Sequence, residues 1–217
     1  MMPPVQLVRS SELSWEPSPR PGVWRKRLFH EGGLENGTVT SLVRFDPGAS
    51  FQSHDHPGGE EIIVLSGVFS DHQGDHGKET HLLNPEGYSH APFTEMGCLL
   101  FVRLRQYAGT QQLTTDLPAG DNPSGMSQIT LGRESGSMRW FLSGALGKDK
   151  SNTVEGVLGL GGQEALKSLA CFAVSGSFHV GQYALNEHDW LSINSADDVR
   201  ELSLTGDGQL YMNVELL

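Results

Sequence analysis

Short apolar segments separated by turn residues fill residues 22–107. The segments VWRKRLF, TVTSLVRF, EEIIVLSGVFSD, THLLNPEG and CLLFVRLRQY are each short enough for a strand. The 27 glycines and 11 prolines of the chain favour turns over long helices. This spacing predicts an antiparallel β-barrel or β-sandwich, and therefore an all-β fold.

The second half of the chain shows a weak sequence similarity to the first half. VLSGVF at residues 64–69 resembles AVSGSF at residues 173–178, 109 positions later. Two further pairs follow in the same order, LLNPEG (82–87) with ALNEHD (184–189) and CLLFVRL with QLYMNVEL. Because the order is kept, we expect a duplicated β-domain of roughly 100 residues per copy.

The duplication predicts two domains joined by a linker. Residues 108–127 are polar, rich in Gly, Pro, Thr and Ser, and lack periodicity, so we expect them to form the linker. The first domain then covers residues 1–107 and the second covers residues 128–217.

The chain has a formal net charge of −11 and a sequence pI of about 5.2. Nucleic acid phosphates and anionic membrane surfaces would be repelled by most of such a surface, so we expect neither as a partner. The amino terminus lacks a signal-peptide pattern, and the sequence contains only two cysteines. These features predict a cytoplasmic protein without disulfides.

Residues 54–61 read HDHPGGEE and concentrate metal-ligating side chains. His54 and His56 are two residues apart, which on a strand places both imidazoles on one face. The Pro-Gly-Gly that follows predicts a turn or bulge, after which a carboxylate can swing back toward the imidazoles. Two imidazole nitrogens and a carboxylate oxygen suit Zn²⁺, Fe²⁺, Mn²⁺ or Ni²⁺.

Strand alternation does not decide between Glu60 and Glu61, because residues 62–65 are apolar on both faces and a Gly-Gly bulge can reset the alternation. The spacing favours Glu60, since G-x(5)-H-x-H-x(3)-E-x(6)-G holds only with that glutamate. About thirty residues later, NPEGYSH supplies P-x-G-x(2)-H, a turn followed by a returning strand. His90 at its end is the candidate third imidazole.

Both stretches resemble the two sequence motifs of the cupin superfamily. Their amino-acid sequence is closer still to the ChrR-like cupin domain of ChrR-type anti-sigma factors. The stretches that carry this resemblance are HDHPGGEEIIVLSGVFSDHQGDH, NPEGYSHAP and GCLLFVRL. PGVWRKRLF and RFDPGASF extend the resemblance over residues 21–107. It implies a jelly-roll barrel in which His54, His56, Glu60 and His90 coordinate one metal ion, zinc in the ChrR cupin and iron in dioxygenase relatives.

The sequence departs from the superfamily pattern at two structural positions in the first half. Glu79 stands where a glycine usually opens the second motif, and Thr94 stands where an asparagine is usual. In the second half the departures reach the ligands. The positions facing His54, His56 and Glu60 hold Gln163, Ala165 and Leu169, and the residue nearest to the equivalent of His90 is Ser192. We therefore expect a bicupin with one metal site, zinc being the expected ion.

Other chemistry-bearing residues have simpler interpretations. Asp71, His72, Asp75 and His76 in SDHQGDHG fit a polar hairpin tip, where Gly and Asp serve turn geometry. The remaining histidines lack partners at ligand spacing and are expected to be surface or hydrogen-bonded residues. Cys98 and Cys171 adjoin apolar strands and are expected to be buried thiols. Trp24, Trp140 and Trp190 are expected to lie in the core.

Two functions from different classes remain open. One is a regulatory sensor, in which the metal-binding cupin reports a small molecule, metal or oxidant to a partner protein in a transcriptional stress response, as the ChrR resemblance implies. The other is a metal-dependent dioxygenase or related enzyme, in which open coordination positions receive substrate or dioxygen. The sequence favours the sensor, with a small-molecule ligand or a regulatory protein as partner, and leaves the oligomeric state open, a dimer being one arrangement.

ChrR-type proteins also carry a helical zinc module with an H-x(3)-C-x(2)-C signature that binds the sigma factor. Neither cysteine of this chain is placed for that signature, and only about twenty residues precede the cupin region. We therefore expect that this chain by itself does not hold a sigma factor.

Overall fold

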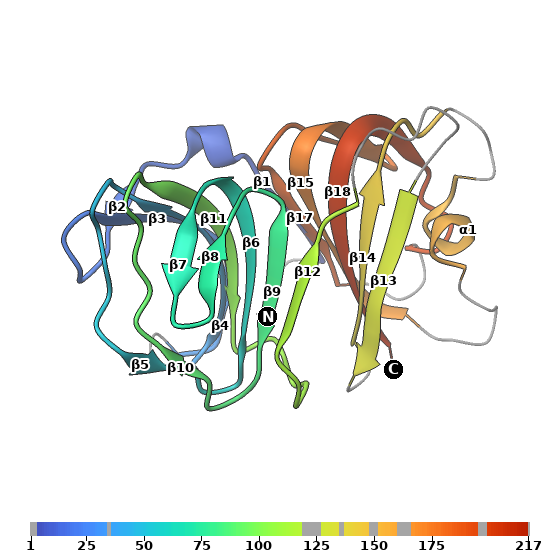
Figure 1. Cartoon of the computed structure of the whole chain (residues 1–217). Coiled ribbons are helices and arrows are strands. Elements are labelled where there is room, and N and C mark those ends of the chain that lie inside the picture. The colour runs from blue at the N-terminus through green and yellow to red at the C-terminus, as the bar shows by residue number, and fades with distance from the viewer. Residues whose placement is uncertain are drawn as a thin grey trace. The chain divides into compact units, whose positions relative to one another are not determined.

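The computed structural model is almost entirely antiparallel β-structure (Figure 1), which confirms the all-β prediction. The described residues contain one short helix, α1 (Val154–Leu158), and one turn of 3₁₀ helix, η1 (Ser10–Glu12). No helix in the described part of the chain is long and apolar enough to cross a membrane. The structure describes residues 4–33, 36–118, 127–134, 137–147, 152–159, 166–194 and 199–216.

The chain forms two compact units. The first unit is Leu13–Leu117, and the second unit is Met1–Glu12 together with Pro118–Leu217. Each unit holds one seven-stranded antiparallel sheet.

The sheet of the first unit has its strands in the order β12, β9, β6, β11, β4, β3, β2. Two further pairs of short strands, β5 with β10 and β7 with β8, lie outside this sheet. The strands are β2 (Glu16–Pro17), β3 (Val23–Glu31), β4 (Thr38–Phe45), β5 (His54–Asp55), β6 (Glu60–Gly67), β7 (Phe69–Asp71), β8 (Gly74–His76), β9 (Thr80–Asn84), β10 (Ser89–His90), β11 (Cys98–Leu104) and β12 (Leu113–Asp116).

The sheet of the second unit has the order β1, β17, β15, β18, β14, β13, with β16 paired to β15. The strands are β1 (Val5–Val8), β13 (Ser127–Glu134), β14 (Ser137–Ser143), β15 (Leu166–Val180), β16 (Tyr183–Leu185), β17 (Trp190–Ile193) and β18 (Leu204–Leu216). Strand β1 from the amino terminus thus completes the edge of this sheet, and an ion pair between Arg9 and the buried Asp189 (2.6 Å) fixes it there.

Strand β12 has the corresponding place at the edge of the first sheet, where it pairs with β9. It lies inside the segment 108–127 that the sequence predicts as a linker, so the first part of that segment is built into the first unit. Residues 119–126 lie outside the described residues.

The strand register of the two sheets repeats at the sequence offset of 109. In the first sheet Glu60 pairs with Asn84 and Ile63 with His81; in the second, Leu169 pairs with Ile193 and Phe172 with Trp190. The Ser-Gly pair in each of the two similar segments, VLSGVF and AVSGSF, also has the same backbone geometry. Gly67 and Gly176 both have φ of +75°, and an added Cβ would meet a carbonyl oxygen at 2.1 Å and 2.0 Å. Only glycine fits there.

The register corrects two details of the sequence alignment. It matches β9 with β17, so LLNPEG corresponds to the residues from Leu191 onward and not to ALNEHD. It also gives Ser192 the place of Leu83, not that of His90. Gln163 and Ala165 lie outside the described residues, whereas Leu169 is fully buried at the position of Glu60.

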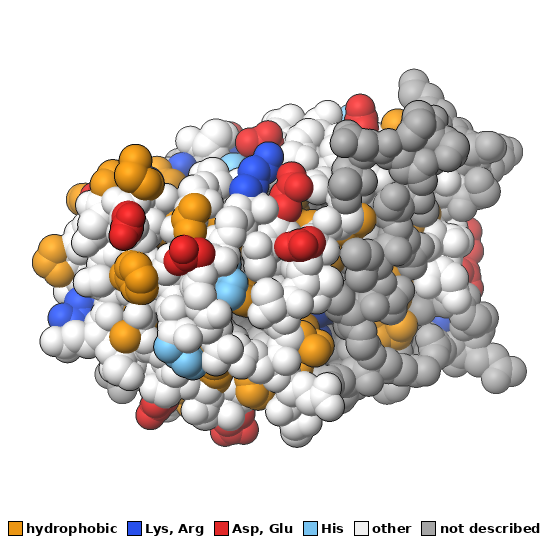
Figure 2. All heavy atoms as spheres, in the orientation of Figure 1, with side chains coloured by type: hydrophobic (Ala, Val, Ile, Leu, Met, Phe, Trp, Pro, Cys, Tyr) orange, Lys and Arg blue, Asp and Glu red, His pale blue; other side chains and the backbone are white. Residues whose placement is uncertain are grey.

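The surface fits the acidic composition. Figure 2 shows acidic side chains spread over the face in view, with apolar side chains among them. Val68, Phe93, Met96 and Leu113 are the large apolar side chains that are exposed among the described residues. Scattered exposed apolar residues of this kind are normal for a globular protein.

Candidate metal centre

The two short strands β5 and β10 bring histidines from distant parts of the sequence together. They pair in antiparallel register, and His54 lies directly opposite His90. His56 follows β5, and its backbone N–H donates to the carbonyl of Tyr88 (3.0 Å), which continues the contact between the two segments.

A glycine turn then returns the chain to the site, as the Pro-Gly-Gly sequence predicts. Gly58 and Gly59 both have φ of +74°, and a Cβ on Gly59 would lie 2.3 Å from the carbonyl oxygen of Tyr107. A side chain there would clash with backbone, so the tight turn requires glycine. The next residue, Glu60, begins β6 with its side chain beside the histidines.

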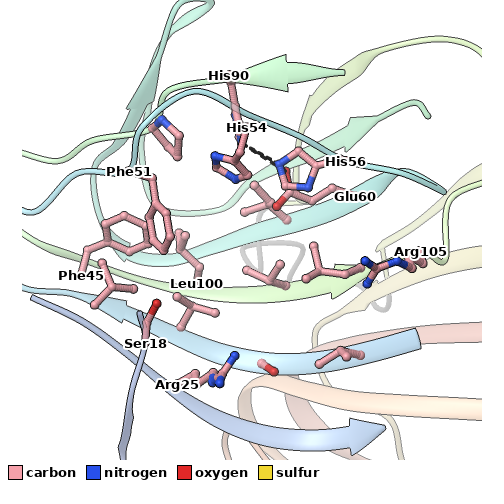
Figure 3. Close-up of a pocket in the computed structure, with 18 of the residues that line it drawn as sticks. Ser18, Arg25, Phe45, Phe51, His54, His56, Glu60, His90, Leu100 and Arg105 are labelled. Carbon is pink, nitrogen blue, oxygen red and sulfur yellow. Dashed lines mark hydrogen bonds and ion pairs between the residues drawn. The ribbon is translucent and has the colours of Figure 1, made fainter. Parts of the chain in front are cut away.

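Three imidazoles converge in this cluster. One ring nitrogen from each of His54, His56 and His90 lies within 4.8 Å of the other two. His56 Nε2 is 3.0 Å from His90 Nε2, the contact drawn as a dashed line in Figure 3. Oε2 of Glu60 lies 3.5 Å from His56 Nε2 and 3.6 Å from His90 Nε2. The four residues selected from sequence therefore meet at one point.

Hydrogen bonds at the far side of two rings orient them. Nδ1 of His54 lies 2.9 Å from the carbonyl oxygen of Gln52, and Nδ1 of His90 lies 2.9 Å from Oδ2 of Asp71. Both oxygens only accept, so each Nδ1 carries the proton and donates it. In a neutral imidazole the lone pair is then on Nε2, the nitrogen turned toward the cluster.

Asp71 is the residue that sequence reasoning missed. The predicted hairpin is present as β7 and β8, but the Asp71 side chain is only 3% exposed and also accepts from the hydroxyl of Tyr88 (3.1 Å). The missed signal is strand alternation, because Phe69 and Asp71 share one face of β7 and the Phe69 ring lies 6.0 Å from that of His90.

The rest of the hairpin stays apart from the cluster. Asp75 accepts from the Ser70 hydroxyl (2.6 Å), and the exposed His72 stacks on Tyr88 with ring centroids 5.5 Å apart. His76 is buried, with Nε2 3.4 Å from Oδ1 of Asp71.

Burial sets the protonation of the cluster. Desolvation lowers the pKa of His56 to about 3 and also lowers that of His54, so both imidazoles are neutral near pH 7. Desolvation raises the pKa of Glu60 to about 7, with His90 and the hydrogen bond from Asn84 acting in the opposite direction. Burial alone would raise the pKa of Asp71. The hydrogen bonds from His90, Gln73 and Tyr88 together outweigh this effect, so the pKa of Asp71 lies below its usual value.

Glu61, the alternative carboxylate, points to the other face of β6. Its oxygens lie 2.9 Å from His81 Nε2 and 3.0 Å from Nη1 of Arg103, and all three side chains are buried. This arrangement places Glu60, and not Glu61, beside the histidines.

The donor set fits a divalent metal ion. Metal binding requires neutral imidazoles, and burial favours the neutral form of His54 and His56. The hydrogen bonds from Nδ1 leave Nε2 available, as is usual for metal-ligating histidines. Three nitrogens and one carboxylate oxygen suit Zn²⁺, Fe²⁺, Mn²⁺ or Ni²⁺.

A cavity of about 400 Å³ opens beside the cluster (Figure 3). His54, His56, Glu60 and His90 line one end of it. The inner faces of β3, β4 and β11 supply most of the remaining wall, which includes Phe45, Leu100 and Val102. The volume lies in the range of roughly 300–1,000 Å³ that is typical of small-molecule sites.

The two departures from the superfamily pattern have local structural roles. Glu79 has φ of +71°, the left-handed conformation for which glycine is the usual residue. Thr94 donates to the carbonyl of Val68 (2.6 Å) and accepts from the N–H of Gly97 (3.1 Å), and so holds the loop before β11. Neither touches the cluster.

Both cysteines are buried and unpaired, as expected. Desolvation raises the pKa of the Cys98 thiol to about 12 and raises that of Cys171 as well. The thiolate form that redox reactions need is therefore suppressed at both positions.

Residues 4–108 match the model of a known domain family, the ChrR cupin-like domain. No curated protein matches the sequence. Many solved structures are similar to this chain, and three of those with a similar fold over nearly its whole length illustrate the range. A candidate dioxygenase from Nostoc punctiforme is 14% identical with a TM-score of 0.67, covering 99% of this chain and 84% of that one.

The other two are a bacterial pirin and a decarboxylase. The pirin YhhW from Escherichia coli, solved in complex with nickel(II), is 12% identical with a TM-score of 0.65, over 98% of this chain and 99% of that one. An oxalate decarboxylase from Bacillus subtilis is 9% identical with a TM-score of 0.58, over 96% and 76%. The TM-scores establish a shared fold, and sequence identities this low leave the activity open.

Proposed function

Since the chain is a member of the cupin superfamily, we propose that its first unit binds one divalent metal ion through His54, His56, Glu60 and His90 and serves a regulatory, sensing role. Zinc is the expected ion, with iron, manganese and nickel as the other candidates for such a donor set. The partner is a small-molecule ligand, or a separate regulatory protein that responds to the occupied site.

The convergence of the three imidazoles is the observation that carries this proposal. Ligand nitrogens from two separate segments lie within 4.8 Å of one another, beside a buried carboxylate. Burying these polar groups costs stability unless a partner satisfies them, and a cation between them would do so. A structural role alone would not need the cavity next to them.

The side chains of the first unit have separate tasks in this proposal. His54 and His90 present Nε2 to the ion because Gln52 and Asp71 hold their Nδ1 protons. Glu60 supplies the anionic oxygen, held by the amide of Asn84 (3.1 Å). The bound ion would supply an open coordination position to a molecule in the cavity.

The division of the chain follows from this assignment. We propose that the metal-binding domain is built mainly from residues 1–107 and that residues 128–217 form most of a cupin domain without a metal site. The buried Leu169 at the position of Glu60 supports the last part. Two edge strands cross these bounds, because β12 from the predicted linker 108–127 belongs to the first unit and β1 belongs to the second.

The enzyme alternative rests on the same cavity. A metal-dependent dioxygenase needs a metal with open positions beside a pocket for an organic substrate, and few helper residues when the metal itself is redox-active. The cavity of about 400 Å³ at the cluster meets the spatial requirement. The enzyme therefore stands as the second candidate.

Elemental analysis of the protein purified without added metal tests the first proposal. We expect about one equivalent of a divalent metal in the wild-type chain and a clear loss in His90→Ala. Absence of bound metal, together with no uptake of zinc, iron, manganese or nickel by the chelated protein, would refute it.

Oxygen uptake separates the two functions. Protein reloaded with iron is incubated with candidate organic substrates under an oxygen electrode. Catalytic oxygen consumption that depends on His90 would favour the enzyme, whereas retention of zinc without turnover supports the sensor.

A further inference from the structure

The charges that line the cavity reverse the balance of the whole chain. The sequence has 26 acidic and 15 basic residues, yet among the described residues three arginines and two acidic residues line the cavity. The acidic residues, Asp55 and Glu60, both lie at the histidine end. Arg25 and Arg27 lie on β3, and Arg105 lies just beyond the end of β11.

Among the three arginines described as lining the cavity, Arg25 is the one with a buried N–H that lacks a hydrogen-bond partner. Its Nε is buried and makes no hydrogen bond within the described part of the chain. Arg25 forms no ion pair with a carboxylate of the described residues, whereas Arg105 donates to the carbonyl of Gly37 (3.3 Å). A guanidinium is always charged, so a buried unpaired N–H is costly and needs an acceptor.

The sheet places Arg25 across the cavity from the metal ligands. Its backbone pairs with Val43 on β4, Val43 pairs with Leu100 on β11, and Leu100 pairs with Val64 on β6. Three strand spacings of about 4.8 Å each thus separate the strand of Arg25 from the strand that begins at Glu60. Figure 3 shows Arg25 on the opposite wall from the histidines, with Ser18 near it.

The surface between these two ends is apolar. Val43, Leu100 and Val102 project from neighbouring strands into the cavity, and Phe45 and Phe51 close one side with ring centroids 5.7 Å apart. A ligand that reaches both ends therefore needs an apolar body and not only a charged head. The planar fork of an arginine matches a carboxylate in two parallel hydrogen bonds.

We propose that this cavity binds a small apolar carboxylic acid, with its carboxylate on Arg25 and its body over Val43, Leu100 and Val102. The far end of the molecule then faces His54, His56 and His90. Only that last feature rests on the proposed metal-binding function, because the contact with Arg25 requires no metal.

Calorimetric titration with phenylacetate tests the proposal, in zinc-loaded and in chelator-treated protein. Phenylacetamide has the same body without the charge, and phenyl phosphate carries a different anion. We expect phenylacetate to bind at millimolar or lower concentration, and phenylacetamide to bind at least 10-fold more weakly.

The matched variants are Arg25→Leu and Arg44→Leu. Arg44 lies on the neighbouring strand β4 but faces away from the cavity, since Val43 and Phe45 on either side line it. We expect Arg25→Leu to weaken phenylacetate binding by roughly 10- to 100-fold without changing zinc content, and Arg44→Leu to leave both unchanged.

Four outcomes decide the matter. Loss of phenylacetate binding in Arg25→Leu, with and without zinc, supports the proposal even when the protein fails to bind zinc. Equal affinity in wild-type and Arg25→Leu protein, equal binding of phenylacetamide, or binding of phenyl phosphate alone would each overturn the carboxylate assignment. If the protein has a normal zinc content in those cases, the proposed metal-binding function is still supported and only the carboxylate proposal is refuted.

Discussion

Two rows of side chains on the inner faces of the sheets show how the units differ. In the first unit one row reads Leu82, Ile62, Val102 and Ser41, and in the second the corresponding row reads Leu191, Cys171, Met212 and Trp140. The next row begins with Asn84 and Glu60 in the first unit and with Ile193 and Leu169 in the second.

The difference lies in volume and polarity, while the backbone pairing is the same. Trp140 and Leu169 are fully buried in an apolar cluster that also includes Val154 and Leu158 of α1. In the first unit the small Ser41 lines a cavity, and Glu60 faces the histidines at its end. The comparison teaches that one sheet architecture either closes into a packed core or keeps space for a ligand, depending on a few inward positions.

Replacing Trp140 by alanine gives the second unit the unfilled interior of the first. We expect the free energy of unfolding of this unit to fall by about 3–5 kcal/mol, the cost of removing a large buried aromatic side chain. Urea unfolding followed by circular dichroism measures it. Ser41→Ala in the first unit is the matched control, and a Trp140 effect no larger than that control would break the comparison.

Replacing His90 by alanine removes from the first unit a ligand that the second unit lacks. We expect zinc affinity to fall by more than about 100-fold, because even partners outside the ligand set are typically worth 10- to 100-fold. Competition with a chelator of known affinity measures it. His179→Ala changes an exposed histidine in the second unit and is expected to leave the affinity unchanged, and equal affinities in all three proteins would place the metal elsewhere.

Replacing Asp71 by alanine tests whether the hairpin β7–β8 belongs to the metal site. We expect zinc affinity to fall by roughly 10- to 100-fold because His90 loses the acceptor that orients its ring. Asp71→Asn keeps an acceptor oxygen and should recover part of the loss. Asp116→Asn, in the exposed strand β12, serves as the control. An unchanged affinity in Asp71→Ala would reduce this residue to the turn role that its sequence suggests.

The double variant Glu60→Leu with Asn84→Ile introduces into the first unit a pair like that of the second. We expect the metal-free protein to become more stable by about 1 kcal/mol, because a buried polar pair is exchanged for apolar packing. Urea unfolding of chelator-treated protein measures the gain, and zinc binding should be lost at the same time. A loss of stability would show that the polar pair also supports the fold.

The sequence by itself determined the all-β class and the four residues that meet in the cluster. Strand length, turn glycines and motif spacing are local properties, because each is determined by a few neighbouring residues. Gly59 and Gly67 illustrate this, since both have a positive φ at a turn or bulge, a conformation for which glycine is the usual residue. The choice of Glu60 over Glu61 also followed from spacing, and the structure places Glu60 at the histidines.

Only the tertiary structure decided which side chains complete the site. The neighbouring residues of Asp71 suggest a turn residue, but Asp71 contacts His90 because β7 reaches that ring. Arg25 resembles several other charged residues of its strand, but it lines the cavity because β3 forms the far wall. The aligned sequence also misplaced the counterpart of β9, since the pairing of strands and not their similarity fixes the register. Contacts between residues far apart in the chain depend on the whole sheet, and no short segment encodes them.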